Sequence, residues 1–265
     1  MLKLVSNANS EFFRHRPWRC GCQGAVVDPQ RQIFAWFCPQ GVAKIKETQS
    51  QMDPALEQLL REMPELTCGK GLWQNKFHEF DVYEHTLKYV EFLKEMTSDP
   101  DMIVAGYFHD IGKPVVKKQK MSDGMPEEKS PGVPYHEFHD HERVGEEMVR
   151  RMDPKIFIDY SLNQERVAKL VGSHFLPLWH IKKMREAKDF NGFIEKYREL
   201  GRALDSAGLP QADIMTMFLA DTLAKGSDCP DVEELKLARE AIINNVPELL
   251  KALYSLQAKM YGGKE

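Results

Sequence analysis

The sequence predicts an all-α protein, mostly helical, with a small β-containing appendage at its amino end. Residues 1–50 contain two short runs, GAVV and IFAWF, that are rich in β-branched and aromatic side chains and are separated by the turn-like segment 28–32. This pattern is typical of a β-hairpin. From residue 53 onward the signals are helical, and the chain therefore divides into an N-terminal appendage of unknown role (1–50) and a helical domain (51–265).

Asp-Pro pairs mark several helix starts. Asp53-Pro54, Asp99-Pro100 and Asp153-Pro154 each place a capping carboxylate before a proline at the first helical position. Elsewhere, apolar residues at helical spacing form a stripe, as in residues 81–96 and 210–225. The expected helices span residues 54–62, 81–96, 100–109, 140–152, 154–160, 163–173, 178–187, 189–206, 210–225, 230–243 and 246–260.

Residues 113–137 interrupt the helical pattern. Four prolines and two glycines predict a loop, and its length of about 25 residues exceeds what a passive connector needs, so we interpret it as a lid or substrate loop. Lys117, Lys118 and Lys120 lie in this loop. Their charges either steer a phosphate or are simply solvated, and the sequence leaves both open.

Composition limits the classes of function. The chain has 36 basic and 40 acidic residues, for a net charge of −4, which argues against binding along a nucleic-acid track. We expect no membrane span, because no stretch approaches the roughly 20 apolar residues that one requires. The amino terminus lacks a signal-peptide pattern, and the five cysteines are an odd number. A cytoplasmic location is the expectation.

Eight of the nine histidines fall between His78 and His180. The most informative string is AGYFHDIGKP, in which an apolar helix runs into His109 and Asp110 and is ended by Gly112 and Pro114. Neighbouring helical side chains point about 100° apart, so both can reach one ion only near a helix end. An imidazole with a carboxylate is a ligand set for Mn, Fe, Ni or Zn rather than for calcium.

Further candidate ligands lie on neighbouring expected helices. They are His85, His141, His174 and Asp221, the last of which is inserted in an apolar run where burial is costly without a cation or strong hydrogen bonds. The alternatives are a core histidine at position 174 and a buried cap at position 221.

The histidines outside this set are less clearly assigned. His136 and His139 either line the mouth of the site or are exposed, and His139 could replace His141 as the ligand. We expect His78 and His180 to be non-ligands.

These segments resemble the HD domain family of metal-dependent phosphohydrolases. The family pattern H…HD…D is matched by His85, by His109-Asp110 and by Asp221, within residues 76–228. The strings FHEFDVYEHTL, AGYFHDIGKP, FHDHERVGEEM and VGSH are most similar to the HD domain of bacterial CCA-adding enzymes, which are tRNA nucleotidyltransferases. The fold that the resemblance implies is an HD-type helical bundle. The paired-acid strand motif of the nucleotidyltransferase part has no counterpart, so we expect a stand-alone hydrolase unit.

The resemblance implies a role for each site residue. One metal would be held by His85, His109, Asp110 and Asp221, and Asp110 would bridge to a second metal held by His141 and His174. Asp110 and Lys113 would be catalytic, with Lys113 contacting substrate phosphate as a point charge. His139 and Lys117 are further candidates for substrate binding.

The implied function is that of a metal-dependent phosphatase or cyclic phosphodiesterase that acts on nucleotides or RNA-terminal phosphates. One or two divalent transition-metal ions (Mn, Fe, Ni, Co or Zn, with Mg as an alternative) would supply activated hydroxide. The expected partner is a phosphorylated small molecule or an RNA end. Two alternatives remain open: a nucleotide- or RNA-binding module with a structural metal and no hydrolysis, and a di-iron oxygenase.

Overall fold

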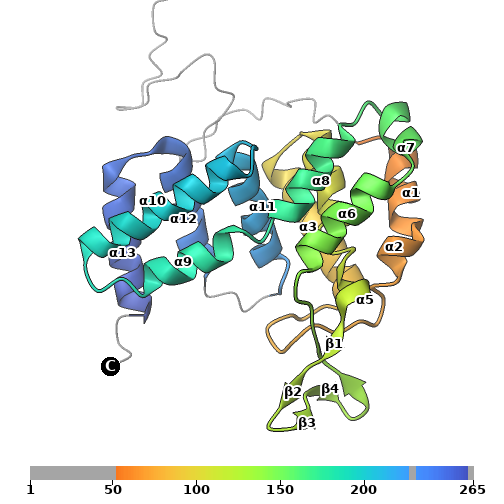
Figure 1. The fold of residues 1–265 in the computed structure, drawn as a ribbon, viewed down its shortest axis with the longest axis horizontal. Coiled ribbons are helices and arrows are strands. Elements are labelled where there is room, and N and C mark those ends of the chain that lie inside the picture. The colour runs from red at the N-terminus through yellow and green to blue at the C-terminus, as the bar shows by residue number, and fades with distance from the viewer. Residues whose placement is uncertain (1–51, 227–230, 262–265) are drawn as a thin grey trace, which may run out of the picture. The chain divides into compact units, whose positions relative to one another are not determined.

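The computed structural model describes residues 52–226 and 231–261. The β-hairpin predicted within residues 1–50 lies outside the described residues, and the division of the chain at residue 50 stays a prediction. The expectation of a predominantly helical protein is confirmed (Figure 1). Over the described ranges, no helix is both long enough and apolar enough to cross a membrane.

Each of the expected helices is present, with ends within two residues of the predicted ones. The side chains of Asp53, Asp99 and Asp153 accept hydrogen bonds from backbone N–H groups of the first turn, as the Asp-Pro pattern predicts. Two short helices were not anticipated, α2 (Pro64–Thr67) and α5 (Lys113–Val116). The others are α1 (Pro54–Glu62), α3 (Val82–Met96), α4 (Pro100–Phe108), α6 (His141–Arg151), α7 (Pro154–Asp159), α8 (Gln164–Ser173), α9 (Pro177–Arg185), α10 (Phe190–Ser206), α11 (Gln211–Leu223), α12 (Val232–Asn244) and α13 (Pro247–Tyr261).

The prediction that residues 113–137 form a loop is wrong, because the segment contains α5 and six short strands. After α5, residues 118–137 form a β ribbon of three short antiparallel pairs, and β1 and β6 close its base (Figure 1). Gly124 and Gly132, which indicated a loop, take positive φ angles of 79° and 78° in the turns of the ribbon. The pairs are β1 (Lys118–Gln119) with β6 (His136–Glu137), β2 (Met121–Ser122) with β3 (Met125–Pro126), and β4 (Glu128–Ser130) with β5 (Val133–Pro134).

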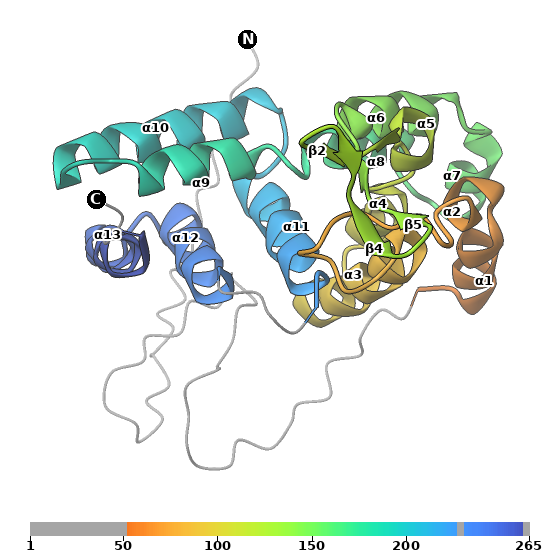
Figure 2. The ribbon, with the colours of Figure 1, turned by 90° about the horizontal axis from the view of Figure 1, so that it is seen from below.

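Two hydrophobic clusters form the core, and α11 contributes to both. Met217 and Ala220 pack into the first cluster with apolar residues of α1, α3, α4 and α8. Ile214 and Phe218 pack into the second with residues of α9, α10, α12 and α13. Figure 2 shows α11 between these two groups of helices. The carboxyl end of α11, which carries Asp221, is thereby held against α3.

Candidate metal centre

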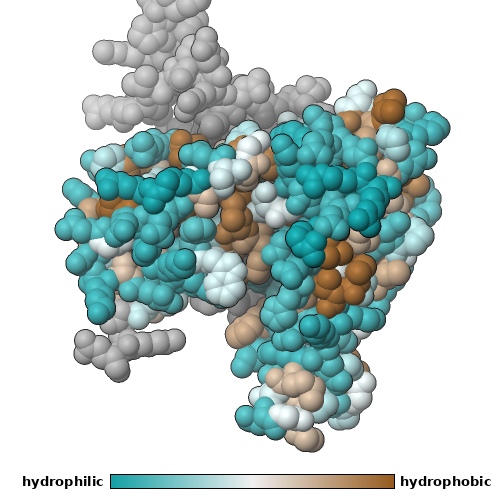
Figure 3. Space-filling view, in the orientation of Figure 1, coloured by the Kyte–Doolittle hydropathy of each residue, from teal (hydrophilic) through white to brown (hydrophobic). Residues whose placement is uncertain are grey.

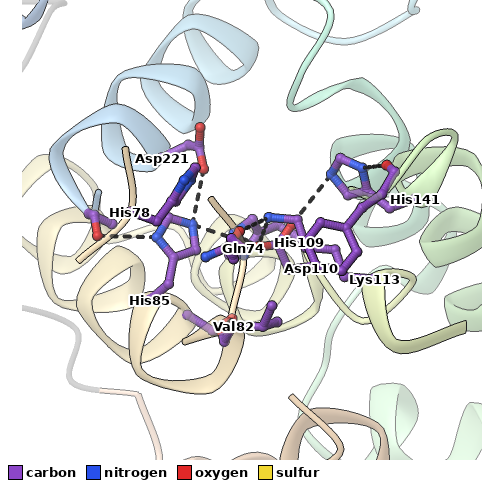
Figure 4. A network of polar contacts seen from close by, with 12 residues as sticks. Gln74, His78, Val82, His85, His109, Asp110, Lys113, His141 and Asp221 are labelled. Carbon is purple, nitrogen blue, oxygen red and sulfur yellow. Dashed lines mark hydrogen bonds and ion pairs between the residues drawn. The ribbon is translucent and has the colours of Figure 1, made fainter. Parts of the chain in front are cut away.

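The candidate ligands converge from five helices on one buried place. None is more than 6 % exposed. The two histidines that end α4 and α8 and the one that begins α6 lie at helix ends, where a side chain can project past the backbone. Figure 4 shows part of this network. The residues are His85 on α3, His109 and Asp110 at the end of α4, His141 on α6, His174 after α8, and Asp221 on α11.

The ligand atoms form two groups. In the first, His85, His109 and Asp221 each offer an atom within 4.8 Å of the others; in the second, Asp110, His141 and His174 do the same. Asp110 faces both groups: its Oδ2 lies 3.1 Å from His109 Nε2 and 3.6 Å from His85 Nε2, while its Oδ1 lies 3.4 Å from His141 Nε2. This is the geometry of a carboxylate placed to bridge two sites.

Backbone carbonyls fix the tautomer of each histidine. A carbonyl oxygen only accepts hydrogen bonds, so the Nδ1 that faces it carries the proton and leaves the Nε2 lone pair for a ligand. The Nδ1–H groups of His85, His109, His141 and His174 donate to the carbonyls of Ala224 (3.1 Å), Gly106 (2.8 Å), Phe138 (2.8 Å) and Val171 (2.7 Å), respectively.

The unpartnered atoms of the centre fit a cation. Among the described residues, His109 Nε2, Asp110 Oδ1, His141 Nε2 and Asp221 Oδ2 are buried without a hydrogen-bond partner. A single buried polar atom without a partner is unfavourable, and four lone-pair donors at one place need a shared acceptor. Imidazole nitrogens with carboxylate oxygens suit divalent transition metals. The residues present therefore fit one or two such ions.

The electrostatics favour the metal-binding protonation states. Burial would raise the pKa of Asp110, but the interactions with His109 and Lys113 outweigh it and hold the pKa well below its usual range. For Asp221 burial acts in the same direction, and Lys225 and His85 keep its pKa low. Burial lowers the pKa of His174 to about 3. Carboxylates stay charged and this imidazole stays neutral near pH 7, as metal ligation requires.

Glycines allow the close packing of the centre. A Cβ atom at Gly106 would lie 2.6 Å from Leu93 Cδ1 and 3.1 Å from the ring of Tyr89. With hydrogen at that position, the Tyr89 ring stacks on His109 at 4.0 Å between centroids. Tyr89 on α3 thus packs against one face of the His109 ring and restricts its rotation.

Lys113 is buried beside the bridging carboxylate. Its Nζ lies 2.6 Å from Asp110 Oδ2 and 2.6 Å from Gln74 Oε1. The sequence predicted Lys113 as a site residue but missed Gln74, which lies outside the matched motifs. His78, expected to be a non-ligand, belongs to neither ligand group; its ring packs edge-on against His85 with 5.4 Å between centroids.

Two candidate substrate residues are not brought to the centre. The side chain of His139 is 74 % exposed and lies 3.6 Å from Glu137. Lys117 is exposed at the end of α5. Of the two alternatives at this position, His141 and not His139 faces Asp110. His136 lies at the base of the β ribbon, where its ring donates to the carbonyl of Trp73.

The fold and the centre define a helical protein with a buried histidine–aspartate cluster that could hold a metal ion. The family model of the HD domain matches residues 82–206 of this chain, and HD domains bind divalent metals. Asp221 lies beyond the matched residues and is added to the site by the packing of α11.

The chain is also similar to an A-adding tRNA nucleotidyltransferase from Deinococcus radiodurans. The two are 29 % identical over 161 residues, which is 60 % of this chain and 31 % of that relative. The chain therefore spans less than a third of the length of the curated relative that it matches.

Proposed function

We propose that this protein is a metal-dependent phosphohydrolase, a phosphatase or cyclic phosphodiesterase that acts on nucleotides or RNA-terminal phosphates. The observation that carries the proposal is the placement of the Asp110 carboxylate between two groups of buried ligand atoms, several of which lack a hydrogen-bond partner in the described part of the chain. The name of the relative, a tRNA nucleotidyltransferase, supports a nucleotide or RNA end as the substrate.

In this proposal, two ions would be held. His85, His109, Asp221 and Asp110 would hold one ion, and His141, His174 and Asp110 would hold the other. Bound there, a divalent ion (Mn, Fe, Ni, Co or Zn, with Mg as an alternative) supplies a Lewis acid for phosphoryl oxygens and lowers the pKa of water toward about 7.

The remaining residues bind and orient. The Lys113 ammonium, held by Asp110, neutralises charge on a phosphoryl oxygen as a point charge. The Nδ1 hydrogen bonds hold the imidazoles in one tautomer and one orientation. Lys117 and His139, exposed on the segments that flank the centre, contact the distal part of the substrate in this proposal.

The test is a phosphate-release assay on the purified full chain. Bis-p-nitrophenyl phosphate, 2′,3′-cyclic nucleotides and 2′- and 3′-nucleotides are supplied with Mn, Ni, Co, Zn or Mg. Asp110→Asn keeps the shape of the side chain and removes its charge, so we expect turnover to fall at least about a hundredfold. Asp159→Asn changes the same group on the surface of α7 and should leave turnover unchanged.

Three results would contradict the proposal. Metal-stimulated turnover that survives Asp110→Asn would show that the reaction does not require the Asp110 carboxylate. Tight nucleotide binding without phosphate release would indicate a binding module, and an iron-specific, oxygen-dependent activity would indicate an oxygenase.

A further inference from the structure

The side chain of Gln74 is buried beside the candidate metal centre, and in the described part of the chain its amide oxygen has a hydrogen-bond partner while its amide nitrogen has none. The residue is 1 % exposed, and its Oε1 accepts a hydrogen bond from Lys113 Nζ at 2.6 Å. An ammonium group only donates, so the amide atom that faces Lys113 must be the oxygen. The orientation of the amide is thereby fixed, and Nε2 carries its two N–H groups elsewhere. Within the described residues, Nε2 is buried without a hydrogen-bond partner.

The backbone holds Gln74 firmly in this place. The N–H of His136, at the base of the β ribbon, donates to the carbonyl of Gln74 at 3.0 Å, and the His136 ring donates to the carbonyl of Trp73. Trp73 also forms an antiparallel bridge with Asp81, the residue that caps α3. Gln74 is thus tied both to the ribbon and to the helix that carries His85. A buried amide donor left unpartnered at such a fixed position indicates a ligand that the protein alone does not supply.

The ligand of Nε2 must be an acceptor and not a cation. An amide nitrogen donates through its two hydrogens and offers no lone pair to a metal. In this it differs from the four unpartnered acceptor atoms of the centre. Lys113 adds to the donors: its ammonium has three N–H groups, of which two are directed to Asp110 and Gln74. Figure 4 shows Gln74 and Lys113 side by side within the network, next to Asp110.

We propose that Gln74 Nε2 and Lys113 Nζ together form a subsite for a phosphoryl oxygen of the substrate, which makes Gln74 a substrate-binding residue. The inference rests on the proposed phosphohydrolase function. A phosphoryl group carries several oxygens, and those that do not contact the metal centre require N–H donors in a buried site. Gln74 Oε1 has a second function: it holds the Lys113 ammonium next to Asp110.

The test uses variants that separate the donor from the acceptor of the amide. Gln74→Glu keeps an oxygen for Lys113 but replaces the N–H donor with an anionic oxygen, and Gln74→Met keeps the length of the side chain without either group. Gln58→Glu, exposed on α1, is the matched control for added charge. Inorganic phosphate is titrated calorimetrically into each metal-loaded protein, metal content is measured by elemental analysis, and circular dichroism verifies folding.

We expect both Gln74 variants to bind phosphate about ten- to a hundredfold more weakly, with unchanged metal content. Gln58→Glu should match the wild type. Phosphate affinity within twofold of the wild type in a folded, metal-loaded Gln74 variant would overturn the subsite, and so would loss of metal from both variants. A metal-loaded wild type that neither binds nor releases phosphate would overturn the proposed function as well. A wild type that hydrolyses phosphate esters while its Gln74 variants bind phosphate normally would overturn the subsite alone.

Discussion

Gly112 lies where the segment after Asp110 crosses α6, and no side chain fits there. A Cβ atom at this position would lie 2.1 Å from the carbonyl oxygen of His141 and 2.9 Å from the backbone N of Gly145. Both are backbone atoms of α6, so no flexible side chain can move aside. Gly112→Ala therefore requires α6 to shift by about 1 Å, since non-bonded atoms in a packed interior keep van der Waals separations.

The shift has a stability cost and a specific effect on metal binding. Overpacking of this kind costs about 1–3 kcal/mol in the free energy of unfolding. Because α6 carries His141, a movement of about 1 Å also exceeds the tolerance of roughly 0.2 Å for metal–ligand distances. We expect Gly112→Ala to lose the ion assigned to Asp110, His141 and His174 and to keep the one assigned to His85, His109 and Asp221.

Urea denaturation of the metal-free protein measures the change in the free energy of unfolding, and elemental analysis of the metal-loaded protein measures the number of bound ions. Gly201→Ala on α10 is the control, because a Cβ atom there meets nothing within 4 Å. That substitution should stabilise the protein by up to about 1 kcal/mol. Wild-type stability and wild-type metal content in Gly112→Ala would refute the reasoning.

Three further predictions concern ion pairs, pH and metal removal. Arg166 forms ion pairs with the carboxylates of Asp99, Asp101 and Asp213. Arg166→Met should therefore lower the free energy of unfolding by about 2 kcal/mol in urea denaturation. Arg150→Met, at an exposed ion pair, should lower it by less than about 1 kcal/mol. Burial opposes ionisation of Glu57, but hydrogen bonds from basic side chains and a tyrosine lower its pKa from 4.5 to about 2. The ionised Glu57 side chain therefore contributes about 1 kcal/mol to the free energy of unfolding above pH 4.5, after solvent screening, and this contribution is lost as the pH falls toward 2. In urea denaturation, Glu57→Gln should remove this part of the pH dependence of stability, whereas the exposed Glu91→Gln should keep it. A chelator should lower the melting temperature, and an ion added at 100 times its Kd should restore about 2.7 kcal/mol; an identical melting curve with and without metal would contradict the assigned centre.

The helices could be predicted because their signals are local. The Asp-Pro pairs cap the backbone within three residues, and each capping carboxylate contacts the first turn that it precedes. The β ribbon could not be predicted in the same way. Its strands are two or three residues long, too short for an alternating pattern, and its base pairs Lys118 with Glu137, which are far apart in the chain. Of the prolines and glycines that indicated a loop, Pro114 lies in α5, and the others lie in the turns and strands of the ribbon.

The candidate site likewise contains residues that the sequence could predict and others that it could not. The order of the motifs predicted six candidate ligand residues, which the fold brings together, but spacing alone could not choose between His139 and His141. The choice depends on the start of α6, from which His141 faces Asp110 while His139 stays exposed. Gln74 gave no local signal at all, because its environment depends on Lys113, a contact made only in the folded chain.

The hydrogen bonds of the histidine rings show which parts of the candidate centre depend on local sequence and which depend on distant packing. The Nδ1 atoms of His109, His141 and His174 each bond the carbonyl three residues earlier, so a local contact helps to orient each of these rings. His85 differs, since its Nδ1 bonds the carbonyl of Ala224, 139 residues away, just after the helix that carries Asp221. The first ligand group therefore depends on the docking of α11 against α3, which the hydrophobic core determines. In the second group, a carbonyl three residues earlier bonds each histidine ring, while the packing of α6 against α8 and against the segment at Gly112 brings the two rings together.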